Sequence, residues 1–309
     1  MTNVAFLGLG AIGAPMAQQI AAPGKQEKQS YALAVWNRNA SKAAAFARAH
    51  SGDKHKERVR HATSPADAAR DADVVITCLP TSREVAALVE GPDGLLVGMT
   101  NGSVLVDCTS GDPATSKQIA LRLAERGIGF LDAPVSGGVA GAESGTLTIM
   151  VGGDAELVDR VRPVLETFGE KIVHVGPIGA GHALKAVNQA MLAVHIWSLA
   201  EGLMALTRAG VSPTVALDVI NASSGRSNTS MNLFPARVLT RAFPRTFKLA
   251  LLDKDLGIAA QLLRDQKVPS PLIQLAAELF SAAHRELGPE ADHVETVKVI
   301  ERQAGGEIK

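Results

Sequence analysis

The chain has 309 residues, of which 46% are hydrophobic and 4% aromatic, and its 31 basic side chains balance its 31 acidic ones. That length allows two domains, while the charge balance excludes a chain-wide field that would attract nucleic acid or an acidic membrane surface. The two cysteines, Cys78 and Cys108, are too few for a disulfide framework and wrongly spaced for a zinc site. We therefore expect a cytoplasmic protein with no nucleic-acid partner and no metal.

Strand-length apolar runs alternate with helical patterns from residue 3 to about residue 176. That alternation is typical of a parallel sheet with helices on both faces. It predicts an α/β fold, with a doubly wound, Rossmann-type sheet in an N-terminal domain of residues 1–177. The expected strands are Val4–Leu7, Ala32–Trp36, Val74–Leu79, Val104–Val106, Phe130–Leu131 and Leu147–Val151, and the expected helices are 11–21, 40–49, 84–89, 114–126 and 155–168.

After Gly179 the strand patterns stop, and an apolar helical pattern continues over residues 181–210. Its length predicts one long helix that leaves the first domain and begins an all-helical substrate and dimerisation domain of residues 178–309. Polar side chains interrupt its most apolar part, Ala186–Leu206, which indicates a buried helix rather than a membrane span. Helices without a sheet often need a partner to cover them, so we expect a homodimer or homotetramer. Further helices are expected over 213–221, 228–240, 249–266 and 271–287.

The opening turn has the spacing G-x-G-x-x-G at Gly8, Gly10 and Gly13. It follows a strand, opens an alanine-rich helix and precedes a second strand, which is the context that a dinucleotide-binding turn requires and a glycine-rich bend lacks. The helix N-terminus then offers N–H groups and a positive dipole end to a pyrophosphate. The residues assigned to this cofactor contact are Gly8, Leu9, Gly10, Ala11, Ile12 and Gly13.

The end of the second strand bears on the choice of dinucleotide. NAD enzymes place an acidic residue there to bind the ribose 2′-hydroxyl, whereas this chain has Asn37, Arg38 and Asn39. Arg38 can pair with a 2′-phosphate, which favours NADP(H) and leaves NAD(H) possible. In the alternative interpretation, Asn37 and Asn39 only cap the next helix and Arg38 points to solvent.

Four further motifs follow: DCTSGDP (107–113), DAPVSGG (132–138), GAGHALKAVNQ (179–189) and FKLALLDKDLGIA (247–259). With the opening turn, in this order and at these separations, they resemble the β-hydroxyacid dehydrogenase family. That family includes 3-hydroxyisobutyrate dehydrogenase, tartronate semialdehyde reductase and, more distantly, 6-phosphogluconate dehydrogenase. The resemblance spans residues 3 to about 300.

The resemblance implies that Lys185 is the catalytic acid/base. Hydride transfer to a carbonyl leaves charge on oxygen, which needs a positioned proton donor, and the reverse reaction needs a proton acceptor. A lysine serves both directions when burial or a nearby cation makes it less basic, whereas an arginine stays protonated. The alternative is an ordinary surface lysine, although Lys185 has apolar neighbours on both sides.

The resemblance also implies a substrate site. Ser136, Gly137 and Gly138 would hold a small carboxylate, unless they form only a turn between strands. Asn188 or Gln189 would bond a substrate hydroxyl; much of the family has Asn at the place of Gln189, and either amide could instead bridge two helices. Arg226 would meet a second polar group or serve no ligand.

The remaining family positions lie near the cofactor. Leu79 and Pro80 match a loop that lines it, and Ser110 matches a residue against the nicotinamide ribose, although this chain has Thr-Ser where the family usually has Ser-Thr. Lys254 matches a lysine near the nicotinamide, and Asp255 an aspartate that orients the site. The alternative for Lys254 and Asp255 is a solvated charge cluster.

The resulting prediction is an oxidoreductase that transfers a hydride between NADP(H), or NAD(H), and a short 3-hydroxy acid or its semialdehyde. An imine reductase usually lacks a lysine at the place of Lys185. A non-catalytic dinucleotide-binding protein would keep the turn and lose the other motifs. A sugar-phosphate enzyme would want more basic residues in the helical domain. The sequence leaves the acyl chain of the substrate open.

Overall fold

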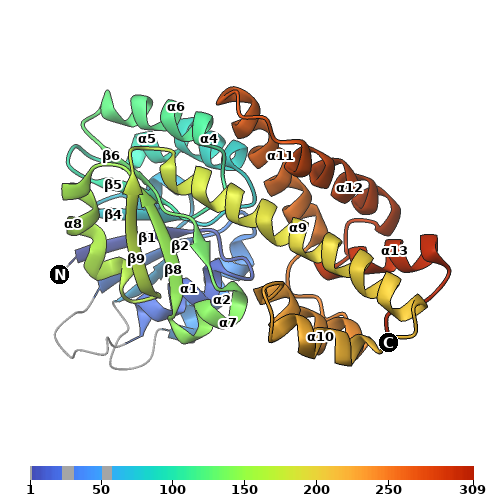
Figure 1. Cartoon of the computed structure of the whole chain (residues 1–309). Coiled ribbons are helices and arrows are strands. Elements are labelled where there is room, and N and C mark those ends of the chain that lie inside the picture. Colours follow the sequence, from blue (N-terminus) through green and yellow to red (C-terminus); the bar gives the residue numbers. More distant parts are fainter. Residues whose placement is uncertain (1, 23–30, 51–57) are drawn as a thin grey trace. The chain divides into compact units, whose positions relative to one another are not determined.

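The computed structural model describes residues 2–22, 31–50 and 58–309. The chain divides into two compact units, Met1–Lys185 (unit 1) and Ala186–Lys309 (unit 2). The boundary falls inside one long helix, α9 (Ala180–Arg208), so that helix belongs to both units (Figure 1).

Unit 1 is built on one mostly parallel sheet with helices on both faces (Figure 1). The strand order is β3-β2-β1-β4-β5-β6-β8-β7, with β9 paired to β8, and the first six strands of that order are parallel. The predicted α/β fold is therefore confirmed. The strands are β1 (Thr2–Leu7), β2 (Tyr31–Trp36), β3 (Val59–His61), β4 (Val74–Thr77), β5 (Val104–Asp107), β6 (Gly129–Asp132), β7 (Val135–Ser136), β8 (Leu147–Gly152) and β9 (Gly169–Gly176).

The register aligns the carboxyl ends of five strands along one edge of this sheet. Leu7 pairs with Trp36 on one side and with Thr77 on the other. Thr77 in turn pairs with Asp107, and Asp107 with Asp132. The glycine-rich turn and the loops after β2, β4, β5 and β6 all start beside this row. In open α/β sheets, ligands bind at that edge, where the strand order reverses.

Helices cover both faces because the strands alternate between two cores. Phe6 and Leu33 face one core, while Leu7 and Leu105 face the other. Strands buried on both faces therefore consist almost wholly of apolar residues, which is the pattern that the sequence displays. The helices of unit 1 are α1 (Gly13–Ala21), α2 (Ala40–His50), α3 (Pro65–Ala69), α4 (Ser82–Glu90), α5 (Leu95–Gly98), α6 (Pro113–Ala124), α7 (Gly138–Ser144) and α8 (Ala155–Leu165).

Unit 2 is helical, as predicted, apart from one isolated bridge between Lys248 and Asp292 within its residues. α9 passes the length and composition test for a membrane-crossing helix, but its stripe Ala186, Ala190, Ala193, Ile196 belongs to the core of this unit. The other elements are α10 (Pro213–Asn221), η1 (Thr229–Leu239), α11 (Leu249–Asp265), α12 (Pro271–Leu287), η2 (His293–Thr296) and α13 (Val297–Ala304).

Three of the predicted elements differ from the structure in their bounds or helix type. The strand expected over Val74–Leu79 ends at Thr77, and its last two residues enter a loop. The helix expected to begin at Ala11 begins at Gly13. The helix expected over 228–240 is a π-helix containing Pro235, whose missing N–H and ring prevent a regular α-helical ladder.

Candidate functional site

In the glycine-rich turn, two of the three glycines have no room for a side chain, and the third has room. Gly8 has φ +108°, and a Cβ there would lie 2.2 Å from the carbonyl oxygen of Cys78. A Cβ on Gly13 would lie 2.0 Å from the carbonyl oxygen of Gly8. Apart from Gly10 itself and its two chain neighbours, no heavy atom of the described residues lies within 4 Å of a Cβ built on Gly10. Gly8 and Gly13 therefore shape the turn, and Gly10 leaves space above the backbone.

That open space lies at the start of α1. The residue before α1, Ile12, makes no side-chain capping bond, so the first N–H groups of the helix are not capped by that side chain. An anionic pyrophosphate satisfies such groups and the helix dipole together. The turn therefore fits a dinucleotide.

Two of the three side chains after β2 make local hydrogen bonds to the backbone. Asn37 Oδ1 accepts a hydrogen bond from Leu9 N at 3.0 Å, which ties the turn to the end of β2. Asn37 Nδ2 donates to Asn39 O at 3.1 Å, and Asn39 Oδ1 accepts from Ser41 N at 3.1 Å near the start of α2. Arg38 is exposed. The side chains of Asn37 and Asn39 thus make hydrogen bonds to the local backbone, while the cationic side chain of Arg38 between them is exposed.

The loops after β4 and β5 are joined by buried hydroxyls. Asp107 Oδ1 accepts from Thr77 Oγ1 at 2.8 Å and from Thr109 N at 3.1 Å. Thr109 Oγ1 accepts from Leu79 N at 3.1 Å, and Leu79 Cδ2 would lie 2.9 Å from a Cβ on Gly8. The structure thus brings Leu79 beside the glycine turn, and partly buried Ser110 and exposed Pro80 adjoin the same joined loops.

Both cysteines lie at this edge as unpaired thiols. Burial and then the nearby Asp107 carboxylate raise the pKa of Cys78 to about 12. Burial, then Cys78 and Asp107, raise the pKa of Cys108 well above its ordinary value. Since the thiolate is the reactive form, neither cysteine is placed to act as a nucleophile at neutral pH.

The motif DAPVSGG forms the short strand β7 and a turn into α7. Ser136 is partly buried and pairs with Thr148 on β8. Gly137 and Gly138 are exposed and have φ of +135° and +66°, values that favour glycine over other residues. A Cβ on Gly138 would meet no described atom within 4 Å. Ser136 therefore adjoins two exposed glycines.

Asp132 fixes the start of α9 to the end of β6, a role that the sequence analysis did not assign. Its carboxylate accepts from Gly179 N at 2.7 Å and from His182 N at 2.9 Å. Lys185 follows on the same helix and is 8% exposed, so it is not an ordinary surface lysine. The sequence signal that could have pointed to Asp132 is an acidic residue directly after an apolar strand pattern. The structure pairs it with Asp107.

The other predicted substrate residues lie in unit 2. Asn188 is exposed and donates to Oε1 of buried Gln189 at 3.2 Å. Lys254 Nζ lies 3.0 Å from Oδ1 of buried Asp255. Arg226 is exposed in the segment between α10 and η1. Lys254 and Asp255 thus form a partly buried ion pair rather than a solvated charge cluster.

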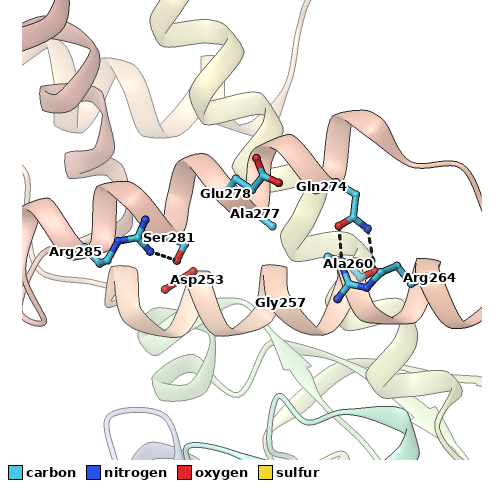
Figure 2. A pocket seen from close by; sticks show the side chains of 9 residues that line it. All are labelled: Asp253, Gly257, Ala260, Arg264, Gln274, Ala277, Glu278, Ser281 and Arg285. Atoms are coloured by element: carbon cyan, nitrogen blue, oxygen red, sulfur yellow. Dashed lines mark hydrogen bonds between the residues drawn. The ribbon is translucent and has the colours of Figure 1, made fainter.

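Unit 2 also contains a groove of about 400 Å³ between α11 and α12 (Figure 2). A hydrogen bond from Arg264 Nη1 on α11 to Gln274 Oε1 on α12 spans it at 2.7 Å, and a bond from Arg285 Nη1 to Ser281 Oγ at 2.9 Å runs along α12. None of the predicted site residues lines it.

Comparison with known proteins identifies the family. Residues 3–176 match the NAD-binding domain of 6-phosphogluconate dehydrogenase. Residues 179–300 match the NAD-binding domain of NADP-dependent 3-hydroxyisobutyrate dehydrogenase. The chain belongs to the β-hydroxyacid dehydrogenase family. The enzyme is an NAD(P)-dependent hydroxyacid dehydrogenase, as the motifs predicted.

Relatives whose names state an activity align with nearly the whole length of the enzyme. It is 35% identical over 304 residues to 2-(hydroxymethyl)glutarate dehydrogenase of Eubacterium barkeri, covering 98% of this chain and 96% of that one. It is 33% identical to NAD-dependent L-serine dehydrogenase of Pseudomonas aeruginosa, covering 99% and 100%. The structure of Mycobacterium tuberculosis 3-hydroxyisobutyrate dehydrogenase with L-serine matches with a TM-score of 0.86 and 30% identity, covering 97% and 99%.

Proposed function

We propose that the enzyme transfers a hydride between NADP(H) and a short 3-hydroxy acid or its semialdehyde, with Lys185 as the general acid/base. The observation that carries this proposal is the placement of Lys185. It is buried and lies three residues beyond His182, whose backbone N–H Asp132 binds near the start of α9 at the carboxyl edge of the sheet. The open glycine turn and the loops after β4 and β5 lie along the same edge.

The nicotinamide supplies the hydride or accepts it. Lys185 Nζ gives a proton to the carbonyl oxygen during reduction and takes the hydroxyl proton during oxidation. Gly8 to Gly13 hold the pyrophosphate at the start of α1. Leu79, Pro80 and Ser110 line the nicotinamide side of the same edge.

The carboxylate of the substrate binds Ser136 Oγ and the backbone N–H groups of Gly137 and Gly138. The support is geometric, since the glycines are exposed and no described atom fills the space beside Gly138. Backbone N–H groups in such turns form concave sites for anions.

The remaining predicted substrate residues belong to unit 2. Asn188 and Gln189 follow Lys185 by three and four residues on α9, which places them on its face of the helix. One of these two amides bonds a polar group of the substrate. Lys254 and Asp255 orient the nicotinamide end as an ion pair, and Arg226 meets a second polar group of the substrate.

The chemistry shared by the relatives narrows the substrate class. 2-(Hydroxymethyl)glutarate, L-serine and 3-hydroxyisobutyrate, named for those proteins, each carry a hydroxymethyl group on the carbon that bears a carboxylate. We therefore propose a substrate with this pattern, whose remaining substituent is the variable part.

The preference for NADP(H) rests on Arg38. No acidic residue ends β2, and the guanidinium is exposed beyond the local bonds of its neighbours. A guanidinium pairs with phosphate through charge-assisted hydrogen bonds. One relative is named as NAD-dependent, so the choice needs a direct measurement.

We also propose a homodimer or homotetramer in the cytoplasm. Unit 2 exposes large apolar side chains, including Met191, Val215, Val219, Leu272 and Leu275, and such surface commonly marks an interface. Two unpaired thiols suit a reducing compartment. Light scattering after size-exclusion chromatography measures the assembly, and a monomer at micromolar concentration would contradict it.

A cofactor and substrate screen tests the function. The purified enzyme is incubated with 3-hydroxyisobutyrate, L-serine, 2-(hydroxymethyl)glutarate or a 2-hydroxy acid, each with NAD⁺ and NADP⁺, and the absorbance of reduced nicotinamide is followed. We expect turnover of at least one hydroxymethyl acid, with higher kcat/KM for NADP⁺. Turnover of the 2-hydroxy acid alone would contradict the proposed substrate class.

A further inference from the structure

The loops after β4 and β5 are joined at two places, and the second has no part in the proposed mechanism. Leu79 N donates to Thr109 Oγ1 at 3.1 Å, close to the sheet. Asp112 N donates to Ser82 Oγ at 2.9 Å, where α4 and α6 begin. Each loop therefore supplies one hydroxyl that accepts from a backbone N–H of the other loop. We call these two hydrogen bonds the loop clamp.

The register of the sheet brings the clamped groups together. β4 and β5 are parallel and pair Thr77 with Asp107. The ladder continues beyond the strands, since Cys108 N donates to Thr77 O at 2.8 Å. Both clamped pairs keep the separation of that strand pair, 30 positions along the chain. The two loops thus run side by side, and the loop clamp holds them at both ends.

The two hydroxyls of the loop clamp are enclosed by the chain. Thr109 is 1% exposed and Ser82 is 4% exposed. Thr109 N donates to Asp107 Oδ1 at 3.1 Å, which fixes the threonine to the end of β5. A Cβ on Gly111 would lie 2.3 Å from Ser82 Oγ, so a side chain there would push the serine away. In such surroundings, a backbone N–H that loses its acceptor is costly because water does not readily replace it.

The loop clamp lies beside the dinucleotide-binding turn. A Cβ on Gly8 would lie 2.9 Å from Leu79 Cδ2, so the residue that donates to Thr109 packs on the first glycine of the turn. Pro80 and Ser110 stand between the two clamped positions of their loops. These are the loops that face the nicotinamide side in the proposed function.

We propose that Thr109 and Ser82 are positioning residues, whose hydroxyls hold the two loops as one fixed surface for the nicotinamide end of the cofactor. The inference rests on the proposed function, which assigns Leu79, Pro80 and Ser110 to that end. Both hydrogen bonds join atoms of the chain itself, so the surface forms without the cofactor. Binding then loses little affinity to the ordering of loops.

Hydrogen exchange of assigned ¹⁵N-labelled amides tests the loop clamp without using activity. In the enzyme without cofactor, we expect slow exchange at Leu79 and Asp112. Thr109→Val should speed exchange at Leu79 alone, and Ser82→Ala at Asp112 alone, because each variant removes one acceptor and leaves the other bond. Fast exchange at either amide of the unaltered enzyme would overturn the proposal, as would variants that leave both rates unchanged.

Cofactor titration tests the positioning role. Loss of one hydrogen bond changes an equilibrium by about fivefold to tenfold, so Thr109→Val and Ser82→Ala should each raise the cofactor Kd by about that factor. Thr109→Ser keeps the hydroxyl and should restore the Kd. If Thr109→Val does not fold, Ser82→Ala and the amide exchange of the unaltered enzyme still decide the question.

Thr77→Val is the matched control. It also removes a buried hydroxyl at this sheet edge, but that hydroxyl donates to Asp107 and accepts from neither clamped amide. Its melting temperature should fall as in Thr109→Val, while its cofactor Kd should stay nearly unchanged. An equal rise in Kd for the two valine variants, or no rise in Thr109→Val, would indicate a merely structural role and overturn the positioning claim.

Saturation with NADP⁺ or NAD⁺ separates this proposal from the proposed reaction. The amide signals of Leu79 and Ser110 should shift when the cofactor binds, because both residues are assigned to its nicotinamide end. Unmoved signals would refute that contact and the positioning claim with it. A substrate screen without turnover would refute the proposed reaction, while the titration and exchange results on the loop clamp stand separately.

Discussion

Unit 1 and unit 2 hold their candidate residues in different ways. In unit 1, Asp107 and Asp132 are buried at strand ends and bind backbone N–H groups of neighbouring loops. In unit 2, Arg226 and Asn188 are exposed on helical or irregular segments. A sheet edge fixes side chains through register, whereas a helix surface leaves long side chains free to adjust. The candidate residues at the sheet edge of unit 1 are therefore held in place more firmly than the exposed ones of unit 2.

The largest effect should come from Lys185→Ala. Loss of a general acid/base typically lowers the rate by about 10²–10⁴-fold, while the cofactor affinity should remain because the glycine turn is untouched. Steady-state kinetics and cofactor titration measure the two separately. Lys117→Ala, at an exposed lysine on α6, is the matched control and should stay active; near-normal kcat in Lys185→Ala would refute the mechanism.

Two glycine variants in unit 1 distinguish a glycine needed for the stability of the turn from one needed for cofactor binding. In Gly13→Ala the new Cβ meets the Gly8 carbonyl at 2.0 Å, so we expect a loss of about 1–3 kcal/mol in the free energy of unfolding. In Gly10→Ala the Cβ enters open space, so stability should hold while the cofactor Kd rises. Thermal melting and cofactor titration compare them, and equal destabilisation of both variants would contradict the model of the turn.

Asp292→Asn tests a comparable buried carboxylate in unit 2. Burial would raise the pKa of Asp292, but hydrogen bonds and charge from His293 and the N–H groups of Phe247 and Thr246 outweigh it and lower the pKa well below its ordinary value. A lowered pKa contributes stability above about pH 4, which is lost as the pH falls through the folded-state pKa.

The Asp292→Asn variant should therefore lose about 1–3 kcal/mol at neutral pH and approach the wild type on acidification. Melting curves measured from pH 7 down to pH 2 provide the comparison, because the deficit should shrink only below about pH 4. Asp265→Asn, at an exposed carboxylate near the end of α11, serves as the control. A deficit that stays constant with pH would show that the carboxylate charge is not responsible.

The smallest effect concerns cofactor choice. Arg38→Ala should raise the KM for NADP⁺ by about tenfold, the loss of one charge-assisted contact, and leave the KM for NAD⁺ nearly unchanged. The exposed Arg48 on α2 offers a control, Arg48→Ala. If the two cofactors were affected equally, or NAD⁺ were preferred by the unaltered enzyme, the assignment to NADP(H) would fail.

Much of unit 1 was predictable because its signals are local. Strands buried on both faces must be apolar, so the strands predicted over Val74–Leu79 and Val104–Val106 were found, with observed bounds of Val74–Thr77 and Val104–Asp107. The spacing of Gly8, Gly10 and Gly13 indicated the dinucleotide-binding turn. The two-residue strand β7 was missed because it is defined by pairing with β8, which no local pattern reveals.

Lys185 was found through a motif, but its burial and its anchoring were decided by tertiary structure. The sequence by itself determined the order of elements, the change from sheet to helices and the family motifs, since these depend on residue type and spacing. Only the folded chain placed Asp132 and His182 at the start of α9 and joined Thr109 to Leu79. Those contacts link residues 30 or more positions apart, and the register of the sheet, rather than neighbouring residues, brings them together.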